Sequence, residues 1–279
     1  MISRTGRPRL SRDATWKPCP TWCVPSSVSD LGRSFVYPFR HRAWLGRVLV
    51  GAALDVAPLV LLLPSLARLL RHGRVITGPA SALLPLAVVL GLAARFLVFG
   101  YLARAAREVL NGTSAGLPPW DRMADDLVEG LKLWLVVLAL CLPAIAVTAG
   151  LTLLVTALTS PTFAWLPLIL AGPPAALLTL AYVPAGLLAA VSDGEMAAAF
   201  DFDRVIHTVG RAFGPYALAF LVAFGAEIFA QLGLIACCIG ILVTRFIAHC
   251  VTVHAFATAF REGVLAATPL SAPEQSPSA

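Results

Sequence analysis

The chain has 279 residues, of which 58% are hydrophobic and only 13% are charged, and its net charge is +6. A soluble domain usually has about 25% charged residues, so this composition excludes an ordinary water-soluble globular protein. Apolar stretches of about 20 or more residues recur along the chain, which is typical of membrane-spanning helices.

The N-terminal residues are polar and basic. Residues 1–32 are rich in Arg, Pro and Ser and have no helical pattern, so we expect a disordered tail, and translation could start near Val28. No short apolar region follows a charged start, which does not fit a cleavable signal peptide. Cys19 and Cys23 are spaced C-x3-C with no second pair, so we expect no metal site there.

Six apolar segments predict six helices that cross a hydrocarbon core of about 30 Å. They lie in a transmembrane domain over residues 33–265, and residues 266–279 are expected to form a disordered tail. The predicted fold class is an all-α, polytopic transmembrane helix bundle. The segments are Val48–Leu70, Ala80–Ala103, Leu131–Leu158, Ala164–Val191, Pro215–Ala236 and Ile239–Phe260.

The distribution of basic residues predicts the orientation. Sixteen Lys and Arg residues lie on the side of the two termini, against Arg68, Arg71 and Arg74 beside the first loop on the other side. The positive-inside rule then predicts a multi-pass protein of the cell (inner) membrane with both termini in the cytoplasm. The basic side would face an anionic inner leaflet. No nucleic-acid partner is expected, since no recognisable binding motif accompanies the charge.

The segment Leu117–Trp134, LPPWDRMADDLVEGLKLW, places four acidic residues directly before the third span. Leu117 and Pro118 would end one helix and start another, and Asp121 can cap the new one. Apolar residues recur at helical spacing after it, so we predict an amphipathic helix at the cytoplasmic surface. Trp120 and Trp134 would anchor that helix at the level of the lipid headgroups.

A second segment, Phe200–Phe213, resembles the first. Phe202 and Asp203 match Trp120 and Asp121 at an offset of 82 residues, and both pairs follow a glycine by eight residues. The repeated unit would be an interfacial amphipathic helix followed by a two-span hairpin, present up to three times. Chance similarity of short segments is the alternative. The apolar face of the second helix is predicted to consist of Val205, Val209 and Phe213.

Several segments resemble the family of bacterial and archaeal membrane proteins called domain of unknown function 4013. They are FVYPFRHRAWLGRVLVGAAL at 35–54, GYLARAAREVLNGTSAGLPPWDRMADDLVEGL at 100–131, FDFDRVI at 200–206 and HAFATAFREG at 254–263. The most specific part is the Leu-Pro-x-Trp-Asp pattern at 117–121. The resemblance covers about residues 33–265 and implies a polytopic membrane protein. It implies no activity, so no functional residue is carried over.

Four ionisable residues lie inside the predicted spans: Asp55, Arg95, Glu227 and Arg245. Charges in hydrocarbon are costly and need partners. Depths counted from the cytoplasmic ends match Asp55 with Arg95 and Glu227 with Arg245, so we expect two intramembrane ion pairs that join neighbouring spans. A path for protons or ions through these groups, or arginines that extend to the interface without pairing, are the alternatives.

The fourth predicted span contains four prolines: Pro167, Pro173, Pro174 and Pro184. Proline removes a backbone donor and kinks or breaks a helix. Many transporters bind ions and substrates at such broken helices. A kinked packing helix is the other interpretation.

No catalytic constellation accompanies these features. His249 and His254 are five residues apart, which does not place them on one helix face as a metal pair, and no nucleophile elbow or phosphate-binding loop occurs. We therefore expect a non-enzymatic, cofactor-free integral membrane protein that organises the bilayer or assembles with a membrane protein partner or with itself. The alternative is a small-solute transporter or channel that uses the broken helix and the buried charges.

Overall fold

The structure is a computed structural model, and it describes residues 29–72, 80–113, 116–159, 163, 165–235 and 240–267. The regular elements in these ranges are all helical. In chain order they are α1 (Ser29–Val36), the 3-10 helix η1 (Tyr37–Phe39), α2 (Trp44–His72), α3 (Ala80–Leu110), α4 (Met123–Leu158), α5 (Trp165–Leu170), α6 (Gly172–Asp193), the 3-10 helix η3 (Met196–Phe200), α7 (Phe202–Arg211), α8 (Phe213–Ile235) and α9 (Gly240–Ala267). Most of the two predicted tails, residues 1–28 and 268–279, lies outside the described residues.

Five helical segments in the described ranges are long and apolar enough to cross a membrane. They correspond to the second to sixth predicted spans and confirm the predicted class of all-α membrane protein. The first predicted span falls within α2, whose 29 residues exceed the about 20 that a crossing needs. Of the loop predicted after it, residues 73–79 lie outside the described ranges. The five segments are Pro85–Leu110, Met123–Leu158, Trp165–Asp193, Phe213–Gly233 and Leu242–Ala267.

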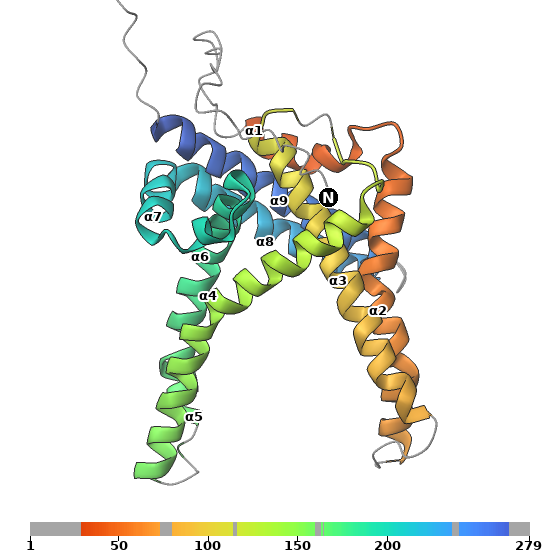
Figure 1. The fold of residues 1–279 in the computed structure, drawn as a ribbon, viewed down its shortest axis with the longest axis vertical. Helices are drawn as coiled ribbons and strands as arrows, with labels where there is room; N and C mark the ends of the chain where they lie inside the picture. Colours follow the sequence, from red (N-terminus) through yellow and green to blue (C-terminus); the bar gives the residue numbers. More distant parts are fainter. Residues whose placement is uncertain are drawn as a thin grey trace, which may run out of the picture.

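Figure 1 shows two arms of helices that diverge from a common end. One arm is the hairpin of α2 and α3, and the other consists of α4, α5 and α6, with the helices of each arm packed on one another. The common end contains α1, α7 and much of α9. Many large apolar side chains are exposed along the arms, as expected where lipid tails surround helices.

The core lies near the common end and joins segments that are far apart in sequence. Its largest fully buried side chains include Tyr37, Tyr101 and Phe246. The ring of Phe246, on α9, fills the space beside Gly51 of α2, where a Cβ would overlap it. Because α9 also packs on α3, α7 and α8, it connects the first arm to the C-terminal helices.

The two arms meet where α3 crosses α4. A Cβ at Gly100 would overlap the backbone carbonyl of Asp126, and a Cβ at Gly130 would overlap the carbonyl of Phe96. The two helices therefore touch backbone to backbone, a close approach that small residues allow in membrane proteins.

The predicted surface helix before the third span is part of α4, a single helix of 36 residues. Its first part runs obliquely across α3, and the remainder descends along the second arm (Figure 1). The predicted cap is wrong: the residue before α4 is Arg122, and no side chain caps the helix. Asp121 does not cap the helix, because its carboxylate accepts a hydrogen bond from Arg104 of α3 instead.

The second predicted surface helix is α7, which is capped by Asp201 through a 3.2 Å bond from the backbone amide of Arg204. Its buried face agrees with the predicted one at Val205 and Val209, which pack in or against the core, but differs at Thr208 and Phe213. Val205 and Thr208 are buried, whereas Phe213 is 70% exposed. The polar side chain of Thr208 can be buried because its hydroxyl donates a hydrogen bond to the carbonyl of Arg204. Gly263 of α9 also leaves room there for the two helices to approach closely.

Candidate functional site

The intramembrane charges gather at one acidic residue. The Asp55 side chain on α2 is 1% exposed and accepts a hydrogen bond from Arg95 of α3. Its second oxygen lies 3.6 Å from Nε of Arg245 on α9. Both arginine side chains are half-exposed. One carboxylate thus links three helices, because α2, α3 and α9 pack on one another.

Glu227 does not pair with Arg245 as predicted. It lies exposed on α8, and within the described residues its carboxylate makes no salt bridge. Arg245 contacts Asp55 and not Glu227, so the predicted second pair does not form there. The reason is the position of α9, which brings Arg245 to the junction with α2 and α3.

A fifth ionisable residue joins this cluster. His249 on α9 is half-buried and lies within electrostatic range of Asp55, Arg95, Glu227 and Arg245. Sequence reasoning missed it because it considered histidine pairs as metal ligands. The available signal was the spacing: His249 follows Arg245 by four residues and so shares its helix face.

The proline-rich fourth span is divided into two helices near the end that lies away from the common end of the two arms (Figure 1). α5 ends at Leu170 and α6 begins at Gly172, with Pro173 and Pro174 in the first helical positions of α6. Prolines are ordinary there because those amides have no helical partner. Backbone bonds from Ala171 to Pro167 and from Ala175 to Ala171 continue across the junction.

The position of this junction bears on the transporter alternative. α6 has 22 residues and, at about 1.5 Å per residue, spans roughly 33 Å by itself. The break therefore lies near one end of the span, away from the midplane where transporters place their broken helices. Pro184 lies inside α6, and Pro167 is buried within α5.

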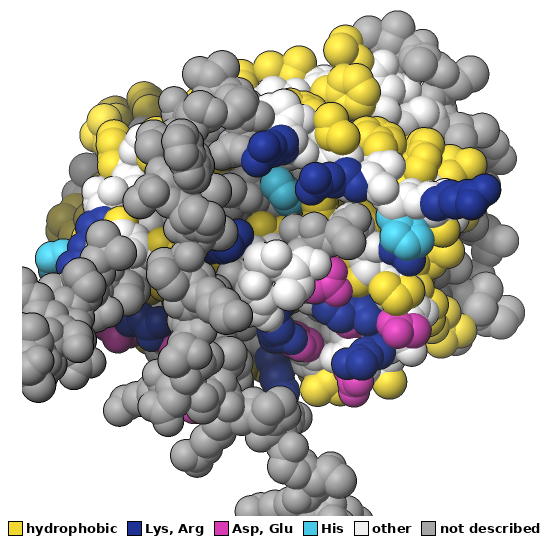
Figure 2. All heavy atoms as spheres, turned by 90° about the horizontal axis from the view of Figure 1, so that it is seen from above, with side chains coloured by type: hydrophobic (Ala, Val, Ile, Leu, Met, Phe, Trp, Pro, Cys, Tyr) yellow, Lys and Arg dark blue, Asp and Glu magenta, His cyan; other side chains and the backbone are white. Residues whose placement is uncertain are grey.

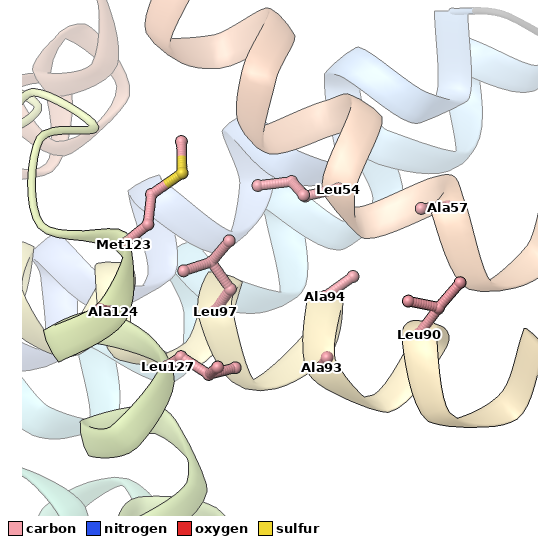
Figure 3. Close-up of a pocket in the computed structure, with 9 residues that line it drawn as sticks. All are labelled: Leu54, Ala57, Leu90, Ala93, Ala94, Leu97, Met123, Ala124 and Leu127. Carbon is pink, nitrogen blue, oxygen red and sulfur yellow. The ribbon is translucent and has the colours of Figure 1, made fainter. Parts of the chain in front are cut away.

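A groove of about 400 Å³ runs between α2, α3 and the start of α4. Figure 3 shows that its lining side chains come from all three helices. All of them are apolar, so the groove offers no polar group to a solute. The lining residues are Leu54, Ala57, Leu90, Ala93, Ala94, Leu97, Met123, Ala124 and Leu127.

The loop that carries the Leu-Pro-x-Trp-Asp pattern is held inside the protein. Leu117 is 1% exposed, and its carbonyl accepts a hydrogen bond from Arg47. The hydroxyl of Tyr101 donates to the carbonyl of Pro118 over 2.8 Å. Trp120 donates through Nε1 to the carbonyl of Arg47 over 2.9 Å, and its ring stacks on Tyr101 with centroids 3.8 Å apart.

Trp120 also packs against protein groups. It is partly buried, and its ring stacks on Tyr101 beside the core. Its anchoring of a helix among the lipid headgroups stays a prediction.

Arg104 of α3 closes the same loop. Its guanidinium donates to the carbonyl of Pro119 over 2.6 Å, to Asp121 over 2.7 Å and to Asp126 over 2.9 Å. The bond from Arg104 holds the pKa of the Asp121 carboxyl below its usual value. Asp121 and Asp126 therefore neutralise Arg104 of α3. Glu129 likewise neutralises Arg107.

The second copy of the pattern shows a parallel arrangement. The hydroxyl of Tyr182 donates to the carbonyl of Ala199 over 2.8 Å, and its ring lies 4.9 Å from that of Phe202. Tyr101 and Pro118 are separated by 17 residues, as are Tyr182 and Ala199.

The parallel extends to the turns, whereas the charged contacts differ between the two copies. Gly112 and Gly194, which follow α3 and α6, both have φ of 72°. Asp203 is exposed and contacts only His207, at 3.3 Å, among the described residues. Arg204 forms an ion pair with Asp193, and this hydrogen bond raises the pKa of Arg204. The geometry therefore supports the predicted internal repeat in its loops.

Comparison with known proteins gives one match. The sequence profile of the family described as "Protein of unknown function (DUF4013)" matches residues 83–239. No curated protein and no solved structure matches the chain. The match spans α3 to α8, including both loop motifs and the α3–α4 crossing. It covers more than half of the 279 residues, so the chain belongs to the DUF4013 family of proteins of unknown function.

Proposed function

We propose that this protein is a non-enzymatic membrane module that assembles with copies of itself or with a partner membrane protein. The observation that carries the proposal is the unequal burial of its spans. Only 11% of the apolar window of α4 is buried, against 50% of that of α9. The second arm thus presents a long helix with few protein neighbours, and a second protein surface could cover it.

The polar groups support the same proposal because they hold the fold together. Asp55 forms salt bridges with two arginines. Arg104 donates hydrogen bonds to the carbonyl of Pro119 and to the carboxylates of Asp121 and Asp126. A buried charge whose partners are all protein groups is suited to positioning helices.

The alternative is a small-solute transporter. It would need a polar cavity beside Asp55 or Glu227 at the level of the membrane centre. The groove described above is apolar, and the division between α5 and α6 lies near a span end. We therefore rank transport second, with Glu227 as the residue that would carry it.

The test is subunit counting in liposomes. The full chain, labelled once at its C-terminus, is reconstituted at low density and counted by single-molecule photobleaching. Leu178→Trp on the second arm and Leu221→Trp on α8 form a matched pair, since both leucines are exposed in spans. Self-assembly through the second arm predicts more than one copy for wild type and for Leu221→Trp, and fewer for Leu178→Trp.

Single copies would require a different partner. Photo-crosslinking from position 178 in native membranes must then give a discrete protein adduct that is missing from position 221. Flux of protons or ions through the same liposomes, lost in Glu227→Gln, would overturn the module and establish the transporter. Single copies with lipid adducts alone would also overturn assembly.

A further inference from the structure

We propose that residues 32–47, here called the N-terminal basic segment, form a binding surface for the phosphate headgroups of anionic phospholipids. This inference deepens the proposed function and rests on it only in taking the chain as a membrane module. The segment contains Arg33, Arg40, His41, Arg42 and Arg47, and it contains no Asp or Glu.

The segment is held in a fixed position on the protein. Tyr37 and Pro38 are buried, and burial raises the pKa of the Tyr37 hydroxyl. Ser34 Oγ lies 3.0 Å from Nδ1 of His254 on α9, and the rings of Tyr37 and His254 are 4.5 Å apart. A preformed surface loses little conformational entropy when it binds a ligand.

Two of its arginines have exposed side chains. Arg47 and His41 contact each other, and Arg47 also binds the carbonyl of Leu117. Arg40 and Arg42 are exposed, and in the described ranges neither has a carboxylate within salt-bridge distance. These two guanidinium groups are therefore available to an external anion.

Glu108 of α3 lies within electrostatic range of Arg47, whereas no described carboxylate lies within salt-bridge distance of Arg40 or Arg42. Asp126, Glu129 and Asp193 are each paired with an arginine of α3 or α7. Figure 2 shows acidic side chains beside basic ones at the lower right and at the lower left, while other basic side chains lie among hydrophobic ones. Arg40 and Arg42 thus have no carboxylate partner among the described residues.

Apolar side chains identify the anion as part of a lipid. Phe35, Phe39 and Leu45 of the segment are 42%, 42% and 52% exposed. Leu45 precedes the predicted start of the first span by three residues, or about 4.5 Å along a helix. These side chains would therefore meet the acyl boundary, while Arg40 and Arg42 meet the phosphates above it.

An acidic protein surface would satisfy the arginines but would leave the apolar side chains in water. Arginine also matches phosphate geometry with two parallel donors. The combination fits an anionic phospholipid better than either a soluble anion or an acidic protein.

The experiment measures lipid selection by the full chain. Purified protein is equilibrated with mixed micelles of equal phosphatidylglycerol and phosphatidylcholine, and retained lipids are counted by native mass spectrometry. The variant is Arg40→Gln/Arg42→Gln. The matched control is Arg122→Gln/Arg211→Gln, which removes two exposed arginines at other sites and changes the net charge equally.

We expect enrichment of phosphatidylglycerol in wild type and in the control. In the variant it should fall about fivefold for each arginine, the equivalent of roughly 1 kcal/mol per basic residue at a charged bilayer surface. Arg40→Lys/Arg42→Lys should retain most of the enrichment, and 1 M salt should reduce it because the groups are exposed.

Unchanged enrichment in the variant would overturn the proposal, and so would an equal loss in the control. Inorganic phosphate that displaces the lipid at millimolar concentration would identify a soluble-anion site instead. If the double variant does not fold, Arg42→Gln and the double lysine variant supply the comparison. Subunit counts in liposomes do not depend on this result, so the two proposals fail separately.

Discussion

Gly100 of α3 and Gly130 of α4 face each other where the two helices cross, and a Cβ at Gly130 would lie 2.7 Å from the backbone nitrogen of Gly100. No side chain fits between the two backbones at this point. The crossing sets the angle between the arms and brings the acidic start of α4 to Arg104.

The first prediction concerns this crossing. Gly100→Ala and Gly130→Ala should each destabilise the protein by about 1–3 kcal/mol or more, because the added methyl must push the helices apart. Gly150→Ala on α4 is the matched control, since no atom lies within 4 Å of its added Cβ. It should be neutral or stabilising by up to about 1 kcal/mol, as alanine favours helix. Thermal unfolding in detergent measures all three, and an equal loss in Gly150→Ala would contradict the close crossing.

The second prediction concerns Asp55. Asp55→Asn leaves Arg95 and Arg245 without their shared carboxylate and should cost about 3–5 kcal/mol. Arg245→Gln should cost less, because Arg95 still pairs with Asp55. Glu227→Gln should have little effect on stability, since Glu227 is exposed and makes no salt bridge among the described residues. Unfolding of the three variants in liposomes checks the order, and a loss in Glu227→Gln as large as that in Asp55→Asn would refute it.

The third prediction concerns the clamp on the loop motif. Tyr101→Phe removes the donor to the buried carbonyl of Pro118 and should cost about 1–3 kcal/mol. Tyr182→Phe removes the matching bond to Ala199 and should cost less, because Tyr182 is only half-buried. Protease sensitivity of residues 112–122 gives a local readout, which should rise in Tyr101→Phe and stay unchanged in Tyr182→Phe.

The fourth prediction uses the two glycines that end α3 and α6. Both have φ of 72°, where an alanine is strained by roughly 1 kcal/mol. Gly194→Ala should cost only this strain, because nothing lies within 4 Å of its added Cβ. Gly112→Ala should cost more, since its Cβ would lie 2.9 Å from a guanidinium nitrogen of Arg261. Equal unfolding temperatures for the two variants would show that Arg261 moves aside freely.

The sequence by itself determined the class of fold and the second to sixth spans. Length and hydropathy suffice there, because a lipid bilayer imposes one dimension and one solvent on every span. The two loop motifs and their spacing were also visible, since each combines a glycine, an aromatic residue and an aspartate in a fixed order. The membership of the family followed from the same residues.

Only the tertiary structure decided how side chains at these positions are used. The depth of Arg245 suggested Glu227 as its partner, but the packing of α9 on α2 and α3 brought it to Asp55. The amphipathic pattern around Trp120 suggested a lipid interface, and only the packing showed that its ring also stacks on Tyr101. In both cases the one-dimensional pattern gives the helix face and its depth, whereas the partner depends on which helix packs against that face.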